Sequence, residues 1–286
     1  MKSILFLIIT VLFWSLNFYF GKIMMEYVSP NVAAFWRYLI GVLALFAMSF
    51  NALPPWKIIK ENLFGILLVG FVGLFGFVYL FFQGLNLTSE MNGALIVSLN
   101  PAMTVLLAVC LQGYKANSRQ IIGILSAFIG IVYLLTKGNP QAILDIEINK
   151  GDLILICGTS VFALQNIWIK KYSANLGNLS FTSLTNLCCL VGFTLVLPFE
   201  TAFPIVDLPT RFWLAAFGMG IPGTALAYYF WNYALNDIGA ARGAVFLNAI
   251  PLFAAMFAIL FGASLFPYHF YSALLIISGL LLVQKT

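Results

Sequence analysis

The sequence predicts an all-α integral membrane protein with ten transmembrane helices, arranged as two inverted repeats of five helices each. Hydrophobic residues make up 62% of the 286 residues and charged residues only 8%, whereas a soluble domain carries about 25% charged residues. Apolar runs close to the length of a membrane crossing recur along the whole chain. The second half also repeats features of the first half at a nearly constant spacing. These three observations together predict the fold class.

Ten apolar runs are each near the roughly 20 residues that cross the hydrocarbon core. A segment in lipid must satisfy its own backbone hydrogen bonds, and these runs lack the alternation of barrel strands, so they predict helices. The predicted helices are 4–25, 31–50, 62–83, 91–111, 119–136, 152–171, 179–197, 211–234, 240–262 and 267–284. They divide the chain into a first repeat at 1–137, a connecting loop at 138–151 and a second repeat at 152–286.

The repetition is visible in residues that recur at offsets of 148 to 150. An offset of 150 pairs Leu85 with Leu235, Gly93 with Gly243 and Pro101 with Pro251, and an offset of 148 pairs Trp14 with Phe162 and Asn17 with Gln165. Each copy has an odd number of predicted spans, so the two copies have opposite orientations in the membrane. Inverted repeats around a site near the midplane are typical of alternating-access transporters.

The charge distribution predicts the membrane topology. With the N-terminus in the cytoplasm, nine of the 14 Lys and Arg residues fall inside, four fall outside, and Arg37 lies within a span. This asymmetry favours both termini in the cytoplasm. The net charge of +5 is spread over several loops, so the density of positive charge is too low for nucleic-acid binding.

The first and sixth spans carry matching polar faces. Trp14 and Asn17 lie on one face of the first predicted helix, and Gln165 lies on the matching face of the sixth. An amide without a partner in hydrocarbon is costly. These faces therefore line a cavity or form interhelical hydrogen bonds, which are common in membrane helices.

Aromatic and amide residues also follow glycine-rich segments in the third and eighth spans. Tyr79 and Gln83 come after the first segment, and Tyr228 and Trp231 after the second. They are candidates for lining a central space, and an interfacial aromatic belt is the alternative.

The fourth and ninth spans pair Ser98 and Pro101 with Asn248 and Pro251. A proline removes a backbone donor and clashes with the preceding turn, so each helix is expected to kink there. The kinks are candidate gates, or static bends that packing accommodates.

Arg37 lies about six residues into the second predicted span. A charge at this depth is costly unless the side chain faces the bundle or reaches the interface. Arg37 could bind a substrate carboxylate, bond helix-end carbonyls to close a gate, or extend to the outer surface.

Several groups that other functions require are missing. The nine Asp and Glu residues lie at predicted span ends or in loops. Their placement favours exchange or uniport over proton antiport, and the sequence offers no catalytic set, metal site or cofactor motif. We therefore expect no enzyme. A stripe formed by Gly123, Ala127 and Gly130 indicates close helix packing, or a contact in a possible homodimer.

Short motifs carry a resemblance to a known family. They are Phe13-Trp14-Ser15-Leu16-Asn17-Phe18, Phe35-Trp36-Arg37-Tyr38, Asn100-Pro101, Ile250-Pro251, Ile122-Gly123 and Ile129-Gly130. With the duplication, the chain resembles the drug/metabolite transporter (DMT) superfamily, specifically its ten-span EamA-type branch. The resemblance implies a transporter of a bacterial inner membrane with both termini cytoplasmic. It also implies a cavity lined by Trp14, Asn17, Tyr79, Gln83, Ser98, Gln165, Tyr228, Trp231 and Asn248. One departure is that the acidic residue usual after the fourth and ninth spans is absent here.

The function expected from these features is secondary transport of small neutral or zwitterionic metabolites by alternating access, with amino-acid export as the leading case. Arg37 would receive a carboxylate, aromatic rings an apolar group or an ammonium, and amides neutral polar groups. Uptake or exchange of a nucleotide-like or phosphorylated metabolite is one alternative, and a non-transporting membrane partner protein is another. The expected partners are a small-molecule substrate and the lipid bilayer.

Overall fold

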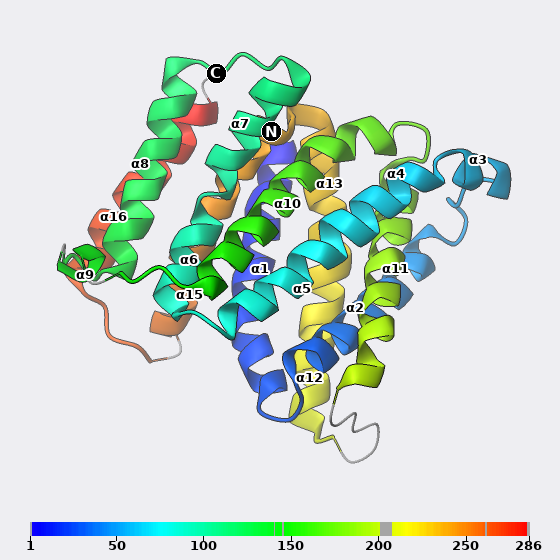
Figure 1. The fold of residues 1–286 in the computed structure, drawn as a ribbon, viewed down its shortest axis with the longest axis horizontal. Coiled ribbons are helices and arrows are strands. Elements are labelled where there is room, and N and C mark those ends of the chain that lie inside the picture. The colour runs from blue at the N-terminus through cyan, green and yellow to red at the C-terminus, as the bar shows by residue number, and fades with distance from the viewer. Residues whose placement is uncertain (1, 140, 145, 201–207, 261, 285–286) are drawn as a thin grey trace. The chain divides into compact units, whose positions relative to one another are not determined.

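The fold is all-helical in the computed structural model, which describes residues 2–139, 141–144, 146–200, 208–260 and 262–284 (Figure 1). These residues contain no β-strand. The first half forms α1 (Lys2–Met25), α2 (Pro30–Ser49), α3 (Trp56–Glu61), α4 (Leu63–Leu67), η1 (Leu68–Phe75), α5 (Gly76–Leu85), α6 (Glu90–Ser98), α7 (Asn100–Gln112), α8 (Ser118–Leu135) and α9 (Gln141–Leu144). The second half forms α10 (Lys150–Ser173), α11 (Asn178–Val196), η2 (Leu197–Phe199), α12 (Thr210–Gly220), η3 (Ile221–Leu226), α13 (Ala227–Ile238), α14 (Ala240–Gly243), η4 (Ala244–Ala249), α15 (Ile250–Leu260) and α16 (Pro267–Gln284).

Nine helical stretches in the described part of the chain are long and apolar enough to cross a membrane, which confirms the predicted fold class. They are Lys2–Met25, Pro30–Ser49, Leu63–Leu85, Met91–Gln112, Ser118–Leu135, Lys150–Ser173, Asn178–Phe199, Ala240–Leu260 and Pro267–Gln284. The eighth predicted span, 211–234, lies in the continuous helical run of α12, η3 and α13 but is not among the nine. Its tyrosines, tryptophans and glycines make this run less apolar than the others.

Local sequence signals explain where several helices begin. The backbone N–H of Val32 donates to Ser29 Oγ at the start of α2 (3.4 Å), and that of Gln120 donates to Asn117 Oδ1 at the start of α8 (2.9 Å). Such caps satisfy N–H groups that have no partner inside the helix.

The chain folds into two compact units that differ from the two sequence repeats. Unit 1 consists of Met1–Tyr79 and Trp168–Asp237, and unit 2 consists of Leu80–Ile167 and Ile238–Thr286. Each unit therefore takes helices from both halves of the sequence, and α5 and α10 run from one unit into the other.

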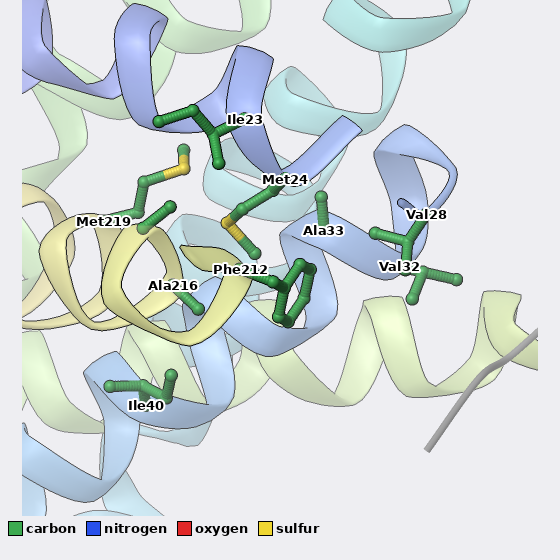
Figure 2. Close-up of a cluster of buried hydrophobic side chains, with 10 residues drawn as sticks. Ile23, Met24, Val28, Val32, Ala33, Ile40, Phe212, Ala216 and Met219 are labelled. Atoms are coloured by element: carbon green, nitrogen blue, oxygen red, sulfur yellow. The ribbon is translucent and has the colours of Figure 1, made fainter. Parts of the chain in front are cut away.

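The core of unit 1 contains side chains from α1, α2 and α12. Figure 2 shows Met24 of α1 beside Phe212 of α12, with Ile40 of α2 and Met219 of α12 in the same cluster. Met24 and Phe212 are fully buried. This packing fixes the start of the run that continues into η3 and α13.

In unit 2, α8 and α16 pack closely through the predicted small-residue stripe. A Cβ added at Gly123 would lie 2.6 Å from the Gly279 carbonyl oxygen, and one at Gly130 would lie 3.0 Å from the Ser272 carbonyl oxygen. The close packing expected from the stripe is confirmed. Because α16 covers the stripe, the stripe offers no contact surface to a second copy of the chain.

Four spans contain irregular helix at repeat-related places. The π-helical segments η1 and η3 interrupt the third and eighth spans. In the fourth span α6 ends at Ser98 and α7 begins at Asn100, with Pro101 in its first turn. In the ninth span the 3-10 segment η4 precedes Pro251. Both helices are thus interrupted next to the prolines, as the sequence predicts.

Candidate functional site

Arg37 is the central charged group of unit 1. Its Nε donates a hydrogen bond to Thr224 Oγ1 (2.7 Å) and its Nη2 donates to the Gly223 carbonyl oxygen (3.2 Å). Thr224 Oγ1 in turn donates to the Met219 carbonyl oxygen (2.9 Å). In a π-helix the backbone bonds are displaced by one residue, which leaves carbonyl groups for other donors. Arg37 therefore anchors α2 to η3.

The anchoring leaves part of the guanidinium unused. Among the described residues the one ion pair joins Arg211 and Glu26 (2.9 Å). Arg37 therefore has no carboxylate partner there, and its charge is stabilised by hydrogen bonds to hydroxyl and carbonyl oxygens. A guanidinium has five N–H groups. Besides Thr224 and Gly223, the side chain of Tyr228 is hydrogen-bonded to Arg37. The N–H groups that remain on the half-buried Arg37 side chain can bind an anion.

Asn17 of α1 binds the same carbonyl group as Arg37. Its Nδ2 donates to the Gly223 oxygen (3.2 Å), while its buried Oδ1 has no hydrogen-bond partner. A Cβ added at Gly223 would lie 2.0 Å from Asn17 Oδ1, so only glycine allows this approach. Nearer the start of α1, Thr10 Oγ1 donates to the carbonyl oxygen of Ala227, the first residue of α13 (3.3 Å). The polar face of α1 is thus turned toward η3 and α13.

A cluster of aromatic rings lies next to these polar groups. The Trp14 ring lies 5.3 Å from the Tyr228 ring and 5.1 Å from the Trp231 ring, measured between centroids. The hydroxyl groups of Tyr38 and Tyr228 are hydrogen-bonded (3.2 Å), and the Arg37 guanidinium carbon lies 5.2 Å from the centre of the Tyr38 ring. Cation and aromatic faces therefore occur side by side in unit 1.

Tyr79 lies at the other end of a chain of rings in the same unit. Its ring stacks on Phe75 at 5.7 Å, Phe75 meets Phe193 edge-on at 5.1 Å, and Phe193 stacks on Tyr38 at 5.8 Å. Unit 1 thus holds six of the ten sequence-predicted binding residues: Trp14, Asn17, Arg37, Tyr79, Tyr228 and Trp231.

The other four predicted residues lie in unit 2 and are differently placed. Ser98 Oγ donates to the Leu95 carbonyl oxygen of its own helix (2.6 Å), which is a local bond. Gln165 is 2% exposed with Oε1 unbonded, and Asn248 is 1% exposed with neither amide atom bonded. Gln83 is half-buried. Since buried polar atoms are normally paired, Gln165 and Asn248 retain hydrogen-bonding capacity.

Unit 2 also contains two polar networks that sequence reasoning missed. One surrounds Asn100, whose Nδ2 donates to the Thr159 carbonyl oxygen (3.1 Å) and whose Oδ1 accepts from Asn166 Nδ2 (3.2 Å). The other surrounds Asp152, which is 3% exposed although it lies near a span end. The signals were the Asn100-Pro101 pair and the Asn149-x-x-Asp152 pattern of a helix cap.

The described residues contain no group of three or more His, Cys, Asp or Glu side chains that could hold a metal ion. What the arrangement in unit 1 can do is bind: a fixed cation for an anionic group, ring faces for an ammonium or an apolar group, and amides for neutral polar groups.

Comparisons with known proteins agree with this description. A model of the EamA-like transporter family matches residues 1–136 and 149–284. The uncharacterized transporter YyaM of Bacillus subtilis strain 168 is 30% identical over 273 residues, which cover 94% of this chain and 89% of YyaM. An uncharacterized transporter of Archaeoglobus fulgidus is 27% identical over 266 residues, 90% of this chain and 88% of its own. A solved crystal structure with 17% identity and a TM-score of 0.82 covers 99% of this chain and 96% of its own, which shows the fold. The family match covers nearly all of both halves, and the chain therefore belongs to the EamA-like transporter family, a family of membrane transporters.

Proposed function

We propose that this transporter moves small zwitterionic or neutral metabolites, with amino acids as the substrate class, and that it exports them across a bacterial inner membrane by alternating access. The observation that carries the proposal is Arg37. It is held in place by Thr224, Gly223 and Tyr228, keeps further N–H groups for an anion, and lies beside aromatic rings.

Each part of an amino acid finds a matching group in unit 1. The carboxylate binds the unused N–H groups of Arg37, because charge-assisted bonds to a guanidinium are short and strong. The ammonium or an apolar side chain lies against the rings of Trp14 and Tyr228. An arginine already oriented by two hydrogen bonds loses little conformational freedom when a ligand binds.

The remaining predicted residues have secondary roles in this proposal. Gln83, Ser98, Gln165 and Asn248 supply neutral hydrogen bonds, and the interrupted helices at Pro101 and Pro251 bend as access alternates. Both termini lie in the cytoplasm, as the Lys and Arg distribution favours. Exchange needs no proton gradient, because the charge that carries recognition is an arginine rather than a carboxylate.

The test is counterflow in proteoliposomes loaded with unlabelled amino acids, with labelled amino acids outside and equal pH on both sides. We expect the label to accumulate. The amine that lacks the carboxylate should compete at least about tenfold more weakly, since it forgoes a charge-assisted bond. Arg37→Met should abolish this preference, and Arg37→Lys should retain the charge but weaken the binding.

Three outcomes would contradict the proposal. Equal competition by the acid and the amine would remove Arg37 from recognition. Accumulation only under a pH gradient would replace exchange by proton coupling. Silence toward all amino acids, with accumulation of a phosphorylated metabolite, would favour the nucleotide-like alternative, which needs several converging cations.

A further inference from the structure

The start of the fourth span is a short helix with a break at one end. Helix α6 has nine residues, Leu99 separates it from α7, and Pro101 lies in the first turn of α7. Proline has no N–H to bond back across the break, so the joint lacks part of the helical hydrogen bonding. Such a joint lets α6 change direction without unfolding either helix.

The α7 side of the joint is fixed. Asn100 donates to the Thr159 carbonyl oxygen (3.1 Å), and Asn100 Oδ1 accepts from Asn166 Nδ2 (3.2 Å) and Thr104 Oγ1 (3.2 Å). Asn100 and Thr104 are fully buried. These bonds tie α7 to α10, and we expect motion at the joint to involve α6.

The far end of α6 is held by one buried carboxylate. Asp152 Oδ1 accepts from Thr88 Oγ1, and Asp152 Oδ2 accepts from Asn92 Nδ2 (3.2 Å). Thr88 lies just before α6 and Asn92 lies in its first turn. Asn92 Nδ2 also donates to the Glu147 carbonyl oxygen (3.1 Å). Helix α6, which also packs against α8, is therefore tied to α10 where it begins and interrupted at Leu99 where it ends.

The same carboxylate caps α10. The Asn149 N–H donates to Asp152 Oδ2 (2.9 Å), and the Asp152 N–H donates to Asn149 Oδ1 (3.2 Å), which is the reciprocal pattern of a capping box. A capping box needs only those two bonds. The further bonds to Thr88 and Asn92 couple the start of α10 to the start of α6.

A polar recess lies directly outside this connection. It has a volume of about 410 Å³ and is lined by Ser89, Met91, Asn92, Ala142, Ile146, Glu147 and Asn149. Asn92 and Asn149 line the recess and donate to Asp152. The recess therefore shares Asn92 and Asn149 with the Asp152 network.

The repeat places a counterpart in unit 1. There Ser3 Oγ donates to Asp237 Oδ2, joining the start of α1 to the end of α13. An offset of 149 relates Ser3 to Asp152 and Thr88 to Asp237, so the hydroxyl and the carboxylate have exchanged places. Along the chain, five candidate spans separate Ser3 from Asp152. Unlike Asp152, Asp237 is exposed.

We propose that α6 is a gate of unit 2, that it hinges at Leu99, and that Asp152 is the positioning residue that latches it closed under the recess. The role as a gate rests on the proposed transport. The latch itself is a physical property that can be measured without a substrate.

The experiment measures how fast a buried cysteine reacts behind the latch. Leu155 is 1% exposed, one turn along α10 from Asp152, and touches the positions of Gly84 and Gly93. In a variant with the four native cysteines replaced by serine or alanine, Leu155→Cys is treated with a membrane-impermeant thiol reagent in proteoliposomes. The readout is the labelling rate with and without Asp152→Asn.

We expect Asp152→Asn to label about tenfold faster, because the loss of charge-assisted bonds favours the open position. Thr88→Val removes one donor and leaves the capping box intact, and it should also speed labelling. Asp237→Asn, at the repeat-related link in unit 1, is the matched control and should leave the rate unchanged. Ile131→Cys, fully buried in α8, should stay unlabelled in every variant, which excludes general loosening.

Two results would overturn the latch. If Asp152→Asn lowers the melting temperature while labelling at position 155 is unchanged, Asp152 is only a helix cap. If Asp152→Asn fails to fold, an unchanged labelling rate in Thr88→Val refutes the proposal by itself. Failure of counterflow with normal latching would count against the proposed substrate and not against the gate.

Discussion

The two π-helical segments of unit 1 share a backbone deviation but are held by different means. Segment η3 is bound by polar side chains, since Asn17 and Arg37 both donate to the Gly223 carbonyl oxygen. Segment η1 is held by close packing on α11: a Cβ at Gly70 would lie 2.6 Å from the Thr185 carbonyl oxygen. Gly73 of η1 and Gly223 of η3 are repeat-related at an offset of 150, so similar sequences have acquired different partners.

Segment η3 can therefore exchange its hydrogen-bond partners, whereas the backbone packing of η1 cannot be exchanged. A ligand carboxylate can replace a carbonyl oxygen as an acceptor for Arg37, because both are oxygen acceptors. Close contact between two helix backbones has no such substitute, and it persists until the helices separate. We therefore expect substrate binding to be felt at η3, while η1 serves as the fixed side of unit 1.

The largest expected effect comes from filling the contact under η1. Gly70→Ala places a methyl group against the backbone of Thr185, which cannot move away as a side chain can. Overpacking costs about 1–3 kcal/mol, so the melting temperature in detergent should fall by about 4–10 °C. Gly21→Ala is the control, since its nearest neighbour would be Met219 at 3.7 Å. Equal melting temperatures for the two variants would show that η1 is not packed as described.

A smaller loss of stability is expected at η3, and a second substitution should restore most of it. Gly223→Ala drives its methyl group into Asn17, whose side chain must rotate away and lose its bond to the Gly223 oxygen. We expect a fall of about 3–6 °C. The double variant Asn17→Ala with Gly223→Ala removes the clash and should regain most of that loss. A double variant as unstable as the single one would place the strain elsewhere in η3.

The sequence could predict the helices and their interruptions because these depend on local chemistry. Apolar length set the spans, Pro101 and Pro251 marked the breaks, and the stripe at Gly123 predicted the tight packing of α8. Trp14 and Tyr228, which were both predicted to line a central space, have ring centroids 5.3 Å apart. Whether these residues bind substrate stays a prediction.

The partners of each polar side chain could not be predicted in this way. Asn17 and Gln165 are related by the repeat and each has an amide oxygen without a partner, yet Asn17 Nδ2 also donates to the distant Gly223 carbonyl oxygen. The outcome depends on which distant backbone oxygen a helix rotation brings near, and no residue pattern encodes that rotation. Asp152 was missed for the same reason, because its partner Thr88 lies 64 residues away.

A third and smaller effect concerns the single hydrogen bond of Asn17. Asn17→Leu removes the bond to the Gly223 oxygen, which keeps Arg37 as a donor. Side-chain hydrogen bonds between membrane helices average about 0.6 kcal/mol, so the melting temperature should fall by about 1–2 °C. The rate of substrate counterflow should fall more than the small loss of melting temperature suggests, because Arg37 alone then donates to the Gly223 carbonyl oxygen of η3. Unchanged counterflow would show that Asn17 has no share in positioning η3.

The smallest effect is expected at Thr185, which lies 148 residues after Arg37 and is its counterpart beside η1. Its hydroxyl donates to the Phe181 (2.8 Å) and Thr182 (3.2 Å) carbonyl oxygens, both in its own helix. A bond within one helix does not hold η1, so Thr185→Val should change the melting temperature by no more than about 1 °C and leave counterflow intact. A loss of counterflow comparable to that of Arg37→Met would mean that η1 also depends on a polar side chain. Both π-helical segments would then be held by polar side chains, and they would differ only in which side chain holds each one.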